Sequence, residues 1–165
     1  MNRTRSTPPQ VSLVVTLQRE GSLCRPALRS LDAACRYAAA RQVITEIVLV
    51  LDRPDPTTRA LAMEAAAPGG YLNREGLVRL VQVDHGDPAG SRNHGLGLVR
   101  APVAGAMDAT HLISANWVVA GLDLLQRHPR SVVHPELLFA FGEEQAICRP
   151  PSSDEPDFRP DVLYS

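Results

Sequence analysis

Four short apolar runs alternate with helical segments along this chain, and this alternation limits its fold more than any other feature. Each run is nearly continuous in apolar residues, as in strands of a parallel sheet that is covered on both faces. The alternation therefore predicts an α/β fold with a doubly wound, Rossmann-like and mostly parallel sheet flanked by helices. The predicted strands are residues 11–16, 46–51, 77–83 and 103–107.

The segments between the predicted strands carry helical signals. Apolar residues recur at near-helical spacing after Ser22, which is a candidate N-cap. We expect Thr57 or Thr58 to open a second helix and the Pro-Gly-Gly turn at 68–70 to end it. The predicted helices are residues 23–41, 58–67, 91–99 and 116–128, and further short strands are expected at 132–133 and 137–141.

The composition is that of one soluble globular domain. The chain has 165 residues, of which 44% are hydrophobic and 21% charged. A net charge of −1 provides no basic surplus for a nucleic-acid backbone, and the longest apolar stretches are too short to span a bilayer. We expect a disordered segment at 1–10, a domain at 11–148 and a Pro-rich tail at 149–165.

Polar residues follow each predicted strand at its carboxyl end. Ligands of doubly wound sheets bind beyond these ends, where the loops from several strands meet. We therefore expect a ligand site where these polar segments converge. The segments are residues 16–20, 52–55, 84–93 and 108–111.

These segments resemble, in the same order, the motifs of family 2 glycosyltransferases with the GT-A fold. Residues 14–20 stand where the family has a strand followed by Thr-Tyr-Asn-Arg, and residues 46–52 stand where an apolar strand closes on an Asp pair. Residues 90–95 match Gly, a spacer and Ala-Arg-Asn-x-Gly, and residues 107–117 take the place of Asp-x-Asp-Asp with its following helix. The resemblance covers residues 11 to about 127 and implies an N-terminal nucleotide-sugar-binding portion, with the acceptor half short or missing.

The resemblance implies an inverting transferase that moves a sugar from a nucleotide diphosphate, a UDP-sugar, to a glycan or lipid-linked acceptor. Such an enzyme would act in the cytoplasm or at the periphery of a membrane. An alternative is a degenerate, non-catalytic module that binds a nucleotide-sugar or another protein. A nucleotidyltransferase matches less well, because the turn at 17–21 is too short for its phosphate-binding loop.

Asp52 is the candidate for recognition of the nucleotide base. The imide edge of uracil has one N–H donor between two carbonyl acceptors, and a carboxylate at a strand end can accept from that N–H. A loop-capping role for Asp52 is the alternative. Thr16 would complete the base pocket, and the resemblance places Gln18 and Glu20 in the same donor site.

Arg92 is the candidate for holding the donor from the third motif. Gly90 allows close approach of the backbone, and the Arg92 side chain brings a permanently charged fork of donors. The resemblance implies that Arg92 and Asn93 help to hold the nucleotide-sugar. A structural ion pair of Arg92 is the alternative, and the two roles are compatible; its candidate partners are Asp52, Asp84 and Asp108.

The Asp-x-Asp segment is altered in this chain. In the family a divalent cation held by carboxylates neutralises the diphosphate leaving group. Asp108 matches the first acidic residue and would contact the ribose or the metal, whereas Thr110 and His111 replace the next two. We expect Mn²⁺ or Mg²⁺ at Asp108 and His111, with imidazole favouring Mn²⁺, or else a purely structural His111.

The general base is left unassigned. In the family it is an acidic residue of the acceptor half, which would deprotonate the acceptor hydroxyl. Glu143 and Glu144 follow the preceding segment too closely for that motif, and we expect them to be an acidic pair exposed at a turn.

Overall fold

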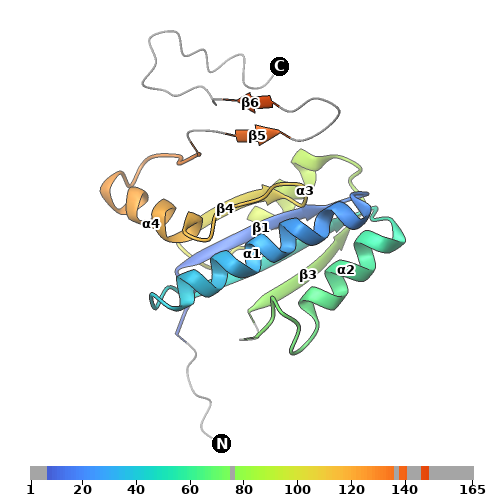
Figure 1. The fold of residues 1–165 in the computed structure, drawn as a ribbon, viewed down its shortest axis with the longest axis horizontal. Coiled ribbons are helices and arrows are strands. Elements are labelled where there is room, and N and C mark those ends of the chain that lie inside the picture. Colours follow the sequence, from blue (N-terminus) through green and yellow to red (C-terminus); the bar gives the residue numbers. More distant parts are fainter. Residues whose placement is uncertain (1–6, 75–76, 136–137, 141–145, 149–165) are drawn as a thin grey trace, which may run out of the picture. The chain divides into compact units, whose positions relative to one another are not determined.

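The computed structural model describes residues 7–74, 77–135, 138–140 and 146–148, which form two units, Met1–Asp123 and Leu124–Ser165. In its described residues the first unit has a four-stranded sheet with the order β3-β2-β1-β4, in which every pairing is parallel (Figure 1). The predicted α/β fold is therefore confirmed. The strands are β1 Val11–Leu17, β2 Thr45–Asp52, β3 Val78–Val83 and β4 Val103–Asp108.

Helices cover both faces of this sheet. All seven residues of the central strand β1 are buried. Alternate residues such as Leu13 pack toward α1 and α2, whereas Val14 and Val50 face the side covered by α3 (Figure 1). Apolar side chains of β1 and β2 thus enter two cores, as strands buried on both faces require. The helices are α1 Cys24–Ala39, α2 Pro56–Ala66, α3 Pro88–Leu96 and α4 Trp117–Arg127.

The first helix starts without a side-chain cap. A 3₁₀ turn, Gly21–Leu23, leads into α1, and no side chain hydrogen bonds to the first turn of the helix. The expected capping role of Ser22 is therefore wrong. The 3₁₀ turn takes the place of a cap, because its tighter bonds use backbone groups that a bare helix start would leave unpaired.

The next two helices begin earlier than predicted because aspartates cap them. Asp55 accepts hydrogen bonds from the backbone N–H groups of Thr57 and Thr58, so neither threonine is the N-cap of α2. Asp87 caps α3 in the same way, which moves its start from Ser91 to residue 88. In both helices a proline follows the cap, a favoured arrangement because the first N–H has no partner within the helix.

The Asp55 cap makes a testable contribution to acid stability. Hydrogen bonds from the Thr58 hydroxyl and from backbone N–H groups lower the pKa of Asp55 from 3.8 to about 2. Its stabilising effect is therefore complete above the unfolded pKa and is lost as the pH falls through the folded pKa. The difference in unfolding free energy between wild type and Asp55→Asn should shrink between pH 3.8 and 2 in urea titrations. A difference that is constant over this range would contradict the assignment.

A buried ion cluster ties the amino ends of the strands together. The Glu46 side chain is 2% exposed, and its Oε2 accepts from the Ser12 hydroxyl at 2.7 Å and from the Arg100 backbone N–H at 3.1 Å. Its Oε1 lies 3.0 Å from Nη2 of Arg79. One carboxylate thereby joins β1, β2 and β3 to the connection between α3 and β4.

The second unit contains a small antiparallel ladder of β5 Leu138–Ala140 and β6 Ala146–Cys148. β5 overlaps the strand predicted at 137–141, whereas residues 132–133 are not in a strand and β6 was not predicted. Residues 1–6 of the segment expected at 1–10, and the whole tail expected at 149–165, lie outside the described residues. Among the described helices, none combines the length and the apolar character that crossing a bilayer requires.

Candidate functional site

The parallel register brings the polar strand ends to one edge of the sheet. Thr16 near the end of β1 is opposite Asp108, the last residue of β4. Asp52 ends β2 one residue beyond the partner of Leu17. The edge formed by these strand ends and the loops that follow them is called the rim below. The predicted convergence at the carboxyl ends of the strands is therefore observed.

Asp108 is the centre of one cluster at the rim. The Thr16 hydroxyl donates to its Oδ1 at 2.5 Å, and Nη2 of Arg92 lies 2.9 Å from Oδ1 and 3.1 Å from Oδ2. Burial raises the pKa of the Asp108 carboxyl, but the hydrogen bonds from Thr16 and Arg92 outweigh it, so the pKa lies below its ordinary value. The structural pairing of Arg92 that the sequence left open is thus formed with Asp108.

His111 folds back onto Asp108 in a tight turn. The His111 backbone N–H donates to the Asp108 carbonyl at 2.9 Å, and His111 Nδ1 accepts from the Asp108 N–H at 3.4 Å. Thr110 and His111 are exposed. Asn93, one residue after Arg92 on α3, is also exposed, so all three residues face solvent.

The side chains around Asp108 do not fit a bound divalent cation. The described residues contain no group of three or more His, Cys, Asp or Glu side chains that could share a metal ion. Of the two expected ligands, Asp108 already binds a guanidinium and a hydroxyl, and Nδ1 of His111 faces a backbone N–H. Mg²⁺ requires about six oxygen ligands. Use of Mn²⁺ or Mg²⁺ stays a prediction.

Asp52 is the centre of a second, buried cluster. Its side chain is 1% exposed, and a carboxylate has about four lone-pair sites for donors. Burial raises the pKa of Asp52, but hydrogen bonds led by the Gly86 N–H lower it below its ordinary value. This geometry matches the loop-capping role that was the alternative for Asp52. The N–H of a nucleotide base could bind Asp52 only by displacing one of these internal donors. The donors are the N–H groups of His85, Gly86 and Asp87, the Ser91 hydroxyl and the Gln18 amide, at 2.8–3.2 Å.

Gln18 and Glu20 follow β1 and extend the Asp52 cluster along the rim. The Gln18 amide reaches Asp52, and both oxygens of Glu20 accept from the Gln18 backbone N–H at 2.9 and 2.7 Å. Burial raises the pKa of Glu20, and the nearby charges of Asp55 and Asp108 raise it further. Carboxylates from three loops therefore lie close enough together to interact at the rim.

Arg53 is a rim residue that the sequence did not single out. Its backbone has φ of 48°, a left-handed conformation that a non-glycine residue rarely adopts. Its Nε donates to Asp84, and its guanidinium lies on Gly86, where an added Cβ would come within 2.3 Å of Nη1. Gly86 in the facing loop is a weak sequence signal for this contact, because its own φ of 66° already favours glycine there.

A glycine in α3 fixes the position of Arg92. A Cβ at Gly95 would lie 2.4 Å from Cγ1 of Val14 and 2.8 Å from Cγ2 of Val50, so the helix backbone rests directly on the sheet. Ser91, on the same buried side, donates to Asp52 at 2.8 Å. Arg92 follows Ser91 and therefore points from a fixed helix toward Asp108.

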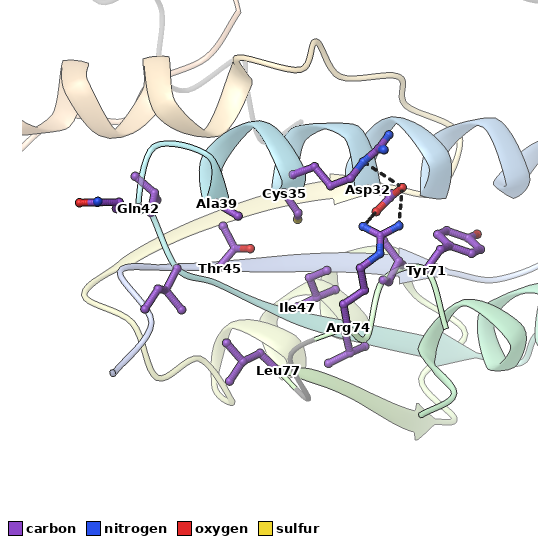
Figure 2. Close-up of a pocket in the computed structure, with 14 residues that line it drawn as sticks. Asp32, Cys35, Ala39, Gln42, Thr45, Ile47, Tyr71, Arg74 and Leu77 are labelled. Carbon is purple, nitrogen blue, oxygen red and sulfur yellow. Dashed lines mark hydrogen bonds and ion pairs between the residues drawn. The ribbon is translucent and has the colours of Figure 1, made fainter. Parts of the chain in front are cut away.

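A separate cavity lies at the amino ends of the strands, opposite the rim. It has a volume of about 170 Å³ and is bounded by the first residues of β2 and β3 and by α1 (Figure 2). Its charged groups pair with one another, because Arg74 and Arg36 both contact the buried Asp32. None of the residues predicted for the site lines it, so we place the candidate site at the rim. Glu143 and Glu144 lie outside the described residues.

The sheet order, the crossover helices and the polar rim define an α/β protein with a GT-A-like fold. The solved structures that share this fold include S. aureus TarS. TarS residues 1–349 match with a TM-score of 0.57 and 18% identity over 73% of this chain and 33% of that chain. The same protein in complex with UDP-GlcNAc matches with a TM-score of 0.57 and 17% identity over 73% and 32%.

A further TarS structure has a TM-score of 0.57 and 17% identity over 73% of this chain and 20% of that chain. This chain therefore spans about a third or less of the TarS chains that it matches. At this identity the likeness shows a common fold, which confirms the fold expected from the motifs. The sequence matches no protein-family model and no curated protein.

Proposed function

We propose that this chain is the donor-binding portion of an inverting glycosyltransferase and that it binds a UDP-sugar at the rim. One observation carries the proposal. Adjacent residues of α3 join the two clusters, since Ser91 contacts Asp52 and Arg92 contacts Asp108. A nucleoside diphosphate has a base at one end and a charged diphosphate at the other. The base would lie at the Asp52 cluster and the diphosphate at the Asp108 cluster.

The chemistry assigned to the rim is stabilisation of the leaving group. In an inverting transfer, the acceptor hydroxyl attacks the anomeric carbon while the bond to the diphosphate breaks, and the negative charge grows on the diphosphate. Arg92 supplies a guanidinium, which matches phosphate oxygens in geometry and charge. The general base stays unassigned. The acceptor would be a glycan or a lipid-linked molecule, in the cytoplasm or at the periphery of a membrane.

The uridine nucleotide is supported by the fold shared with a protein solved in complex with UDP-GlcNAc. Thr16, Gln18 and Glu20 lie at the end of β1, beside the loop held by Asp52. Asp52 would recognise the imide N–H only if one of its internal donors moved away. Exposed Asn93 would help Arg92 to hold the donor, as the resemblance implies.

Removing the Arg92 charge should weaken nucleotide binding. We expect Arg92→Gln to raise the dissociation constant for UDP by roughly 10- to 100-fold, because a charge-assisted contact with phosphate is lost. Isothermal titration with UDP and UDP-GlcNAc measures this. The matched control is Arg59→Gln, an exposed arginine on α2, which should bind like wild type. Equal weakening in both variants would contradict a specific role for Arg92.

A non-catalytic binding module is the second candidate. The replacement of two acidic residues by Thr110 and His111 favours it, because the segment then has a single carboxylate, Asp108. Such a module would bind UDP-GlcNAc without releasing UDP. Coupled detection of UDP release, with and without added sugar acceptors, separates it from a transferase: release above the rate for Arg92→Gln would support the enzyme.

A further inference from the structure

A guanidinium lies beside Asp108, the carboxylate expected to hold a divalent cation. Arg92 makes both of its contacts with the carboxylate through the same nitrogen, Nη2, at 2.9 and 3.1 Å. The described contacts therefore leave the N–H groups of Nε and Nη1 for a ligand. The Arg92 side chain is 39% exposed and that of Asp108 is 33% exposed, so solvent and a ligand can reach the pair.

The groups that would otherwise hold a metal ion have internal partners. Asp108 accepts from Thr16 as well as from Arg92, and the Nδ1 lone pair of His111 faces the Asp108 backbone N–H. Glu20 directs both oxygens to the Gln18 backbone N–H, and Asp55 caps α2. A divalent cation at Asp108 would have to share the carboxylate with a guanidinium and a hydroxyl, and the charge of Arg92 would repel it.

Arg92 is also held in place before any ligand arrives. Ser91 bonds to buried Asp52 on one side of it, and Gly95 seats the next turn of α3 against Val14. A side chain that is already oriented loses less conformational freedom on binding, and a guanidinium keeps its charge at every physiological pH. The geometry thus provides a permanent and preorganised cation.

We propose that this chain binds its nucleotide diphosphate without a divalent cation and that Arg92 supplies the positive charge facing the diphosphate. The inference rests on the proposed function, because it assigns a charge to the same donor site. It also gives Asp108 a different role: the carboxylate orients Arg92 and is itself a negative charge beside the bound diphosphate.

The first test compares UDP binding in EDTA with binding in excess Mn²⁺, by isothermal titration of wild type. We expect the two dissociation constants to agree within about twofold. Arg92→Gln should lose roughly 10-fold or more of its affinity in EDTA, and Arg92→Lys should recover part of it. Binding that requires Mn²⁺ would overturn this inference and leave the proposed function standing. No binding in either buffer would overturn both.

Asp108→Asn provides the second test, because the two roles of Asp108 predict different responses to Mn²⁺. If the carboxylate orients Arg92, the change should alter the dissociation constant for UDP by the same factor in EDTA and in Mn²⁺. If Asp108 is a metal ligand, the change should weaken binding in Mn²⁺ and leave binding in EDTA unaffected. Circular dichroism confirms that each variant is folded before it is titrated, and a loss of affinity confined to Mn²⁺ would overturn the inference.

Discussion

Asp52→Ala should destabilise the protein by about 3–5 kcal/mol, because it removes a buried carboxylate that is the acceptor of five hydrogen bonds. The carboxylate is 1% exposed and accepts three backbone N–H groups of the loop that precedes α3. Urea denaturation followed by circular dichroism measures the change. Asp52→Asn should lie between wild type and Asp52→Ala, since its carbonyl oxygen can still accept while its amide group meets the donors.

The matched control for Asp52 is Asp84→Ala. The Asp84 side chain is 83% exposed after β3, and its surface ion pair with Arg53 should contribute less than about 1 kcal/mol. A loss below about 1 kcal/mol for Asp52→Ala would mean that the loop finds other acceptors, and that the buried cluster is not what orders the rim.

Glu46→Ala should cost a similar amount, about 3–5 kcal/mol, at the other end of the sheet. Removing this carboxylate leaves the Arg79 charge without its partner and the Ser12 hydroxyl without its acceptor in the interior. Thermal and urea unfolding measure the loss. Glu64→Ala, an exposed glutamate on α2, is the control and should stay within about 0.5 kcal/mol of wild type.

A second variant separates the contribution of the Glu46 charge from the contribution of its packing. Glu46→Gln keeps the shape and one acceptor oxygen, so it should recover the bonds to Ser12 and to the Arg100 backbone but not the attraction to Arg79. We expect its stability to fall between that of Glu46→Ala and that of wild type. Equal losses for both variants would show that the charge accounts for the whole effect.

The strands could be predicted because the apolar pattern that marks each one lies within a few neighbouring residues. Residues 46–51 are apolar over a strand length, and the parallel arrangement follows from the helices between strands. The observed starts of α2 and α3 precede the predicted ones because Asp55 and Asp87 cap the helices, and each of these residues precedes a proline. That local signal was present in the sequence.

The contacts of the site depend on residues that are distant in the sequence. The apolar runs predict that Asp52 and Asp108 reach one edge, and this is observed. Sequence alone could not count the donors around Asp52, which come from positions 33 to 39 residues away in the chain. For the same reason it left the partner of Arg92 open among three aspartates. The left-handed backbone of Arg53 has no reliable sequence signal.

The missing side chain at Gly95 limits how this scaffold can change. With no Cβ at position 95, α3 packs directly on the side chains of Val14 and Val50, and a larger residue at any of these three positions would push the helix away from the sheet. New ligand preferences would therefore have to arise at solvent-facing positions of the helix, such as Asn93 and His94, while the peptide chain beneath them stays where it is. Changes in ligand preference are thus confined to the exposed side chains of α3.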